Sequence, residues 1–84
     1  MEYDEKFHAL LSVVILPQII DLIVRNENVS DVEAADAFYR SGTYALLERE
    51  ETKVWHYSPM AIYNIWKTEA DTGKIVMPEE GLLA

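Results

Sequence analysis

Half of the 84 residues are apolar and none is cysteine, which allows one small folded domain and excludes disulfides and thiolate-bound metals. Fifteen acidic residues against seven Lys and Arg give a net charge of −8. This charge disfavours binding to nucleic acid or anionic membranes and suits a basic protein partner. Residues 1–6 are acidic where a signal peptide would be basic, so we expect a cytoplasmic protein.

Residues 9–24 are the most informative stretch, because twelve of these sixteen residues are apolar. A helix on the outside of a small domain needs only one apolar stripe, so this segment must be covered on several sides. We expect a helix over residues 4–25 that is kinked near Leu16 or is divided into two shorter helices, because Pro17 removes a backbone donor and crowds the preceding turn. The run is shorter than the roughly 20 apolar residues that span a bilayer, and Asp21 interrupts it, so we expect no membrane partner.

Two short helices are expected next. Ser30 and Glu33 have the spacing of a capping box, which predicts a helix that begins at residue 31. Gly42 is expected to end this helix in the left-handed conformation, and Thr43 to cap a third helix that reaches about residue 50. The inward stripe of the second helix is expected to consist of Val32, Ala35, Phe38 and Tyr39.

The remaining chain predicts one more helix. Residues 52–57 have strand propensity and can pair only with residues 75–77, as a minimal two-stranded ribbon. Ser58 and Pro59 begin the fourth helix and Gly73 follows its end. Tyr63 falls beside the inward stripe, so we expect it to be partly exposed. That stripe consists of Ile62, Ile65, Trp66 and Ala70. Residues 1–78 form the expected domain, and residues 79–84 a flexible tail.

Few residues suggest catalysis or metal binding. His8 follows Asp4 by four residues, which forms a surface pair on a helix, and two ligands do not make a metal site. His56 lies near Ser58, but that serine is explained by its capping position and lacks oxyanion donors. We therefore predict no enzyme activity and no catalytic residue, cofactor or metal. The acidic cluster is interpreted as a solvated helix end: Glu48, Glu50 and Glu51.

Two features of the sequence are compatible with nucleic-acid binding. The aromatic residues could stack on single-stranded bases, but the chain lacks the basic groove that such binding needs. The second and third helices, joined near residues 41–43, have the spacing of a helix-turn-helix. The third helix offers glutamates where a DNA reader offers cations and amides. A small helix-turn-helix-like transcriptional regulator is therefore kept as the alternative hypothesis.

A recurring pattern covers half of the chain, residues 38–80. It comprises a Phe-Tyr-x-Ser group at residues 38–41, a Glu-Glu-Thr-Lys group at residues 50–53 and Trp-His-x-Ser-Pro at residues 55–59. Tyr63, a Thr-Gly-Lys-Ile group at residues 72–75 and Pro-Glu-Glu at residues 78–80 complete it. This region resembles a family of short proteins of unknown function from low-GC Gram-positive bacteria. The resemblance implies a small bacterial protein, and some such families occur in toxin–antitoxin or mobile-element contexts.

These observations predict an all-α domain of four to five short helices around a kinked apolar N-terminal helix. The other helices can cover only part of that helix, and a bare apolar surface of a few hundred Å² is unusual for a soluble monomer. We therefore expect a homodimer that serves as a non-catalytic protein–protein interaction module, in the form of an acidic adaptor or antitoxin-like partner. The interface candidates are Leu10, Val13, Val14, Leu16, Ile20, Ile23, Val24 and Tyr63.

Overall fold

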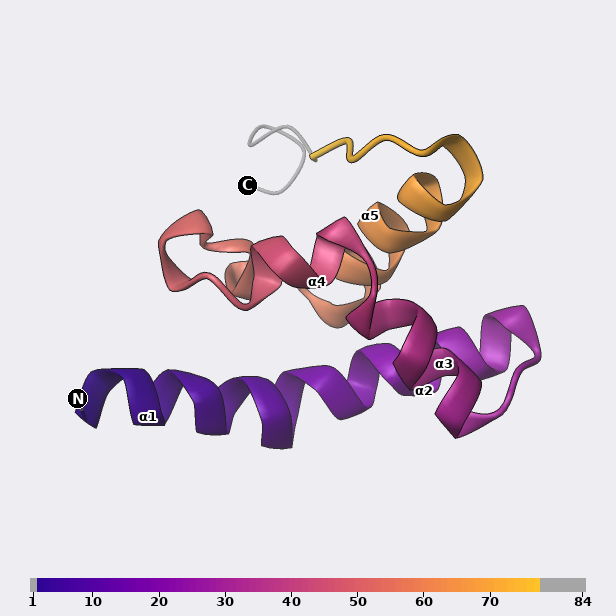
Figure 1. Ribbon diagram of the computed structural model, residues 1–84. Coiled ribbons are helices and arrows are strands. Elements are labelled where there is room, and N and C mark those ends of the chain that lie inside the picture. The colour runs from indigo at the N-terminus through magenta and orange to yellow at the C-terminus, as the bar shows by residue number, and fades with distance from the viewer. Residues whose placement is uncertain (1, 78–84) are drawn as a thin grey trace.

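The computed structural model describes residues 2–77, and the predicted all-α class is confirmed: this range contains helices and turns and no strand (Figure 1). The predicted tail, residues 79–84, lies outside the described residues. Eight helical elements follow one another: α1 (Glu2–Ala9), η1 (Leu10–Ile15), α2 (Leu16–Glu27), α3 (Asp31–Tyr39), α4 (Gly42–Leu47), η2 (Glu50–Thr52), η3 (Val54–His56) and α5 (Pro59–Thr72).

The first three elements form one helical rod that continues through Pro17, so the chain does not divide into two helices there. Instead, η1 is a π-helical turn that ends just before the proline, and the Leu16 N–H donates to the carbonyl of Leu11, five residues back. A π-helical turn interrupts the regular backbone hydrogen bonds of an α-helix, and a proline does the same. The strain expected from Pro17 is therefore taken up by a widened turn.

The widened turn has a packing consequence. In an α-helix, four residues turn through about 40° more than one full turn. Side chains at every fourth position therefore shift gradually around the helix. The π-helical turn absorbs part of this drift. As a result, one row of buried side chains stays on one side of the rod along its length: Phe7, Leu11, Ile15, Ile19 and Ile23.

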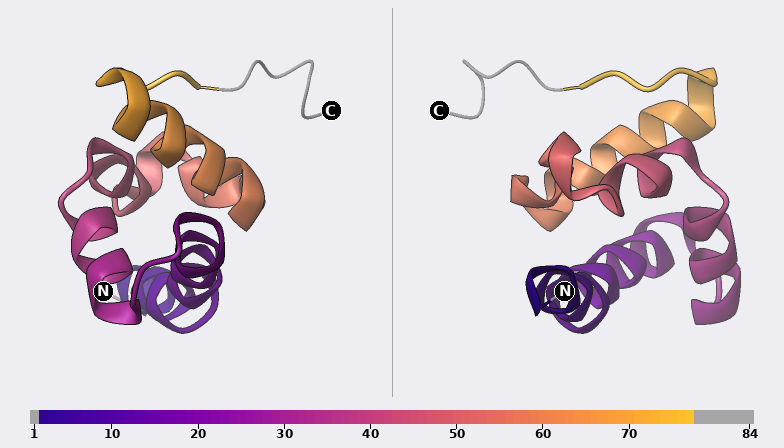
Figure 2. Two further views of the ribbon diagram at one scale, coloured as in Figure 1. Left: turned by 90° about the vertical axis from the view of Figure 1, so that its right-hand side faces the viewer. Right: turned by 60° about the vertical axis from the view of Figure 1, so that its left-hand side comes forward.

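α3 and α5 pack against the rod, and α4 packs on both of these helices. In the end-on view, α4 and α5 lie above the rod and α3 lies beside it (Figure 2). α2 contacts both α3 and α5, and the Phe7 ring meets Trp55 of η3 edge-on, with ring centroids 5.9 Å apart. The centre of the core contains fully buried side chains from four helices: Ile19, Phe38, Leu47 and Ile62.

The start of α3 is confirmed, but of its predicted inward face only Phe38 is fully buried, and Val32 and Tyr39 are exposed. Ser30 and Glu33 form the capping box, with the Ser30 amide donating to the Glu33 carboxylate and the Glu33 amide to the Ser30 hydroxyl. Ala34 and Phe38, one turn apart, are completely buried, whereas Val32 is 78% exposed. The buried face therefore begins at Ala34 rather than at Val32.

The predicted roles of Gly42 and Thr43 are also wrong. Ser41 caps α4 by accepting from the Tyr44 amide, and Gly42 is the first residue of that helix. Thr43 is completely buried. The reason lies in α5: the Glu69 carboxylate accepts from the Gly42 and Thr43 amides at 2.7 and 2.9 Å and from the Thr43 hydroxyl at 2.7 Å.

The predicted ribbon is absent from the described residues. Residues 50–56 instead form the two 3₁₀ turns η2 and η3, joined by Lys53 in the left-handed conformation (φ 59°). The Thr52 hydroxyl donates to the Leu46 and Arg49 carbonyls, and the Trp55 indole N–H donates to the Glu50 carbonyl. These local hydrogen bonds give polar groups of the loop their partners, whereas an isolated two-stranded ribbon is only marginally stable.

The limits of α5 are confirmed. Ser58 caps the helix by accepting from the Ala61 amide, Pro59 is its first residue, and Gly73 ends it in the left-handed conformation (φ 78°). The expected partial exposure of Tyr63 is wrong, because Tyr63 is only 7% exposed. Its hydroxyl has a partner inside the chain, the Glu27 carboxylate at 2.6 Å, which removes the need for water. Ala70, expected in the inward stripe, is exposed.

Candidate interaction surface

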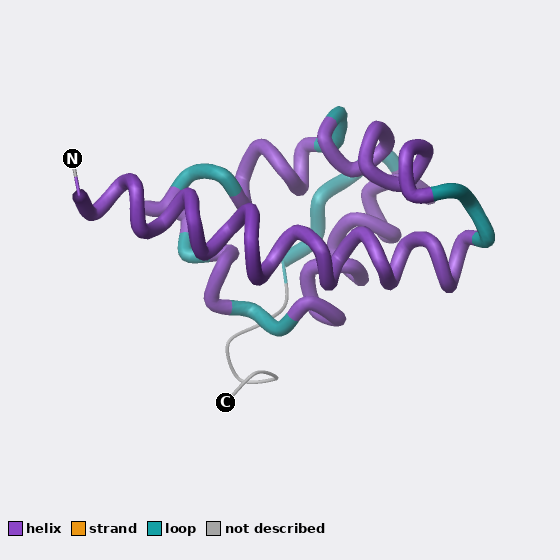
Figure 3. The backbone as a smooth tube through the Cα atoms, turned by 90° about the horizontal axis from the view of Figure 1, so that it is seen from below, coloured by secondary structure: helices purple, strands orange, loops and turns teal. Residues whose placement is uncertain are grey.

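The side of the rod that faces away from the core carries the largest group of exposed apolar side chains on one helix. Val13 is 72% exposed, Val14 45% and Leu10 37%, and Pro17 is exposed on the next turn. We call these four residues the apolar stripe. Seen from below, the rod is the element nearest the viewer, and no other described segment crosses in front of it (Figure 3).

The stripe is exposed because of where it falls between the buried positions. Val13 and Val14 lie between the buried Leu11 and Ile15, and therefore point away from the core row. The adjoining turns carry charge: Lys6 is exposed at one end of the stripe and Asp21 at the other. Asp21 also forms an ion pair with Arg25 at 3.0 Å, with both side chains largely in solvent. The stripe is thus an apolar strip with Lys6 at one end and the Asp21–Arg25 ion pair at the other.

The structure divides the eight predicted interface residues into three groups: exposed, half-buried and core. Leu10, Val13 and Val14 are exposed on the stripe, and Ile20 and Val24 are half-buried farther along the rod. The other three belong to the core of the same chain and cannot contact a partner: Leu16, Ile23 and Tyr63. The predicted interface omits Pro17, which also lies on the stripe. Its spacing of four residues from Val13 is the signal that places it there.

A polar network that the sequence did not reveal fixes the end of the rod to α5. The Glu27 carboxylate accepts from the Lys67 ammonium at 2.8 Å and from the Tyr63 hydroxyl at 2.6 Å. The bond from Lys67, followed by that from Tyr63, lowers the pKa of Glu27 below its usual value. Burial, reinforced by the bond to Glu27, raises the pKa of Tyr63. The network thus joins the end of α2 to α5.

This network predicts a pH dependence of stability. A carboxylate with a lowered pKa in the folded state binds fewer protons than in the unfolded chain, so its contribution is complete above about pH 4.5 and is lost as the pH falls further. We expect the free energy of unfolding to decrease as the pH falls from about 5 to about 3, the range in which carboxyl groups usually titrate. Glu27→Gln should flatten this decrease in urea titrations, whereas the exposed Glu48→Gln should leave it unchanged. The same dependence of the free energy of unfolding on pH in the wild type and both variants would contradict the role of Glu27.

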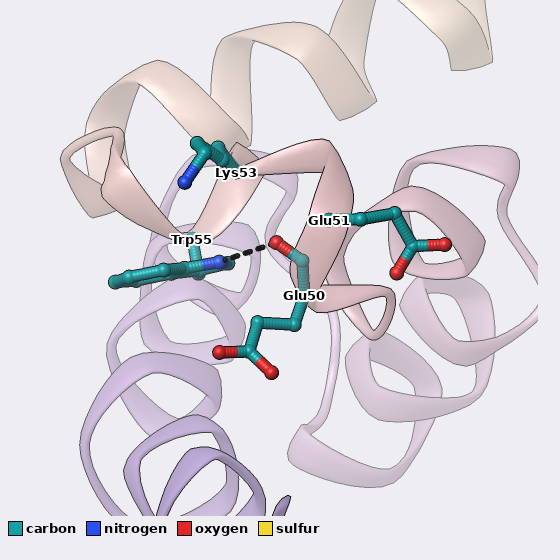
Figure 4. A pocket seen from close by; sticks show the side chains of 4 residues that line it. All are labelled: Glu50, Glu51, Lys53 and Trp55. Atoms are coloured by element: carbon teal, nitrogen blue, oxygen red, sulfur yellow. Dashed lines mark hydrogen bonds between the residues drawn. The ribbon is translucent and has the colours of Figure 1, made fainter. Parts of the chain in front are cut away.

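The acidic cluster lies beside a small pocket of about 260 Å³ (Figure 4). Four residues line it: Glu50, Glu51, Lys53 and Trp55. The Glu51 carboxylate pairs with Arg49 at 2.8 Å, and its pKa is lowered by a hydrogen bond from its own backbone amide and by the Arg49 guanidinium. The indole N–H donates inward to the Glu50 carbonyl. The Glu51 carboxylate and the Trp55 indole N–H thus already have partners within the chain.

The two histidines do not converge with other candidate groups. His8 and His56 are both exposed, and His56 stacks on Trp55 with ring centroids 4.1 Å apart. Within residues 2–77, no group of three or more His, Asp and Glu side chains is arranged to hold a metal ion. The described residues therefore offer the apolar stripe as the feature that most needs a partner.

The rod also bears on membrane association. Residues Lys6–Glu27 form a helix of 22 residues that is long and apolar enough to cross a membrane, so the length argument drawn from residues 9–24 fails. Length and composition of this kind are shared by the core helix of a soluble protein. A third of its most apolar window is buried inside the chain, along the row that starts at Phe7.

Comparison of the chain with models of protein families, with curated proteins and with solved structures finds no match in any of the three. The resemblance of residues 38–80 to short Gram-positive proteins therefore stays a prediction, and the functional argument depends on the structure itself.

Proposed function

We propose that this chain is a non-catalytic protein–protein interaction module that works as a homodimer through the apolar stripe. The observation that carries the proposal is the exposure of Leu10, Val13 and Val14 on one face of a helix whose opposite face is packed. Contiguous exposed apolar surface of this kind marks interaction sites in soluble proteins. A symmetric second copy is the commonest way to cover it.

The charge of the chain supports a protein partner over a lipid surface. Each copy has a net charge of −8, which repels the anionic headgroups that attract most surface-binding helices. The exposed Asp21 on the stripe side adds to the cost of insertion. The proposal includes a cytoplasmic location. A dimer would carry this acidic charge twice and could act as an adaptor or antitoxin-like partner for a basic protein.

Substitution at Val13 tests the proposal. Val13→Asp should convert a dimer into a folded monomer, because a carboxylate would have to be desolvated at the interface without a partner. Val32→Asp is the matched control, since Val32 is equally exposed but lies on α3, away from the stripe. Size-exclusion chromatography with light scattering gives the mass of each, and circular dichroism the helix content. A monomeric wild-type protein, or a dimeric Val13→Asp protein, would refute the proposal.

A helix-turn-helix regulator is the second candidate, favoured by the adjacent α3 and α4 and their short connection at Arg40 and Ser41. α4 has only six residues and buries Thr43 and Leu47, which leaves little side-chain surface to read bases. Binding to random duplex DNA at low salt separates the candidates. A regulator binds and weakens steeply as salt rises, whereas the acidic module should not bind.

A further inference from the structure

We propose that the partner of the apolar stripe is a second copy that packs antiparallel, with the two-fold axis passing between Val13 and Val14. This inference rests on the proposed function and specifies its geometry. It follows from a symmetry in the order of residues along the rod. In this register, residue i of one copy lies opposite residue 27 − i of the other.

The apolar residues satisfy this symmetry. Val13 lies opposite the partner's Val14, and Leu10 lies opposite the partner's Pro17. All four stripe residues are exposed, so each apolar side chain gains an apolar neighbour. The stripe consists of two columns, Leu10 with Val14 and Val13 with Pro17, and the two-fold axis exchanges them. An isologous interface requires such a self-complementary patch.

The charges at the ends of the stripe distinguish antiparallel from parallel packing. Lys6 precedes Leu10 by four residues and Asp21 follows Pro17 by four, so they extend the two columns in opposite directions. In the antiparallel register each Lys6 faces the partner's Asp21, whose carboxylate also pairs with Arg25 of its own rod. Parallel packing would place lysine against lysine and aspartate against aspartate. Charge complementarity of this kind sets orientation and register at helix interfaces.

The same pattern favours a second copy over other occupants. A membrane surface would have to accommodate Asp21 at one end of the stripe, and a basic partner would gain nothing from the uncharged centre formed by Val13 and Val14. A copy of the rod matches both the apolar centre and the charged ends. In the view from below, no other described segment crosses in front of the rod (Figure 3).

Cross-linking of introduced cysteines tests the register, because the chain has no cysteine of its own. The double variant Ala9→Cys/Gln18→Cys places the two cysteines opposite each other in this register and keeps Lys6 and Asp21; both positions are exposed. It is treated with a bismaleimide that spans about 10 Å, the usual distance between packed helix axes. Within one rod the two positions are about 14 Å apart, from a rise of about 1.5 Å per residue, so the reagent cannot join them. Each single variant is the control, since its two copies of the same cysteine are separated by a similar length in the antiparallel dimer.

We expect most of the double variant to migrate as a covalent dimer, with at least a fivefold smaller linked fraction in either single variant. Efficient linking of Ala9→Cys alone would show parallel packing and overturn the inference. A dimer by light scattering that the reagent cannot link in the double variant would overturn the register and leave the proposed function standing. A monomer by light scattering at all concentrations would refute the proposed function itself.

Discussion

Phe38→Ala should destabilise the chain by about 3–5 kcal/mol, the usual loss for a completely buried phenylalanine. The Phe38 ring lies at the centre of the core and meets Tyr44 edge-on, with ring centroids 5.8 Å apart. A domain of this size has a total stability of only about 5–10 kcal/mol, so the variant should be close to unfolding at room temperature. Urea titration followed by circular dichroism measures the change.

The matched control for Phe38 is Val32→Ala on the same helix. Val32 is 78% exposed, so its loss should change the free energy of unfolding by less than about 0.5 kcal/mol. The pair also tests the inward face of α3, because the sequence pattern alone placed both residues in the core. A Val32→Ala loss comparable to that of Phe38→Ala would contradict the observed face.

Glu69→Ala is expected to cost about 2–3 kcal/mol, because it leaves several polar groups at the start of α4 without their acceptor. The carboxylate serves the Gly42 and Thr43 amides and the Thr43 hydroxyl, and Thr43 is completely buried. Burial alone would raise the pKa of Glu69, but these hydrogen bonds outweigh it and lower the pKa. The interaction is therefore strongest for the ionised carboxylate.

Glu69→Gln distinguishes charge from shape at this site. Glutamine keeps the length of the side chain but presents an amide NH₂ where one of the donors of α4 needs an acceptor, so we expect a loss intermediate between the wild type and Glu69→Ala. Thermal unfolding at pH 7 measures both variants. If Glu69→Ala unfolds at the wild-type temperature, the carboxylate does not hold α4 to α5.

The local features of the fold could be predicted from the sequence, because their partners lie within a few residues. Ser30 and Glu33 satisfy each other across three residues, and Ser58, Pro59 and Gly73 define the limits of α5 by their own backbone preferences. Capping chemistry of this kind depends little on the rest of the chain. The apolar length of the rod, too, was evident from composition alone.

Two of the errors arose where the hydrogen-bond partner is distant in sequence. Gly42 was expected to end a helix, but Glu69, 27 residues away, accepts its amide hydrogen at the start of the next one. Tyr63 was expected to be partly exposed, but Glu27, 36 residues away, accepts from its hydroxyl within the chain. Such contacts exist only after the helices have packed.

The candidate surface was predicted in outline and refined by the structure. The sequence indicated that the rod had more apolar circumference than the other helices could cover, but it could not say which side they would cover. Packing of the row that includes Ile19 and Ile23 decides this and assigns Leu16 to the core as well. The exposed remainder is the apolar stripe.

The central claim is that this stripe is covered by a second copy of the chain in solution. Sedimentation equilibrium of the unmodified protein between about 1 and 100 µM, the range that separates weak from stable association, tests it most directly. We predict a mass that approaches about 19 kDa, twice the 9.7 kDa of one chain. A mass that stays at 9.7 kDa across the whole range would contradict the claim.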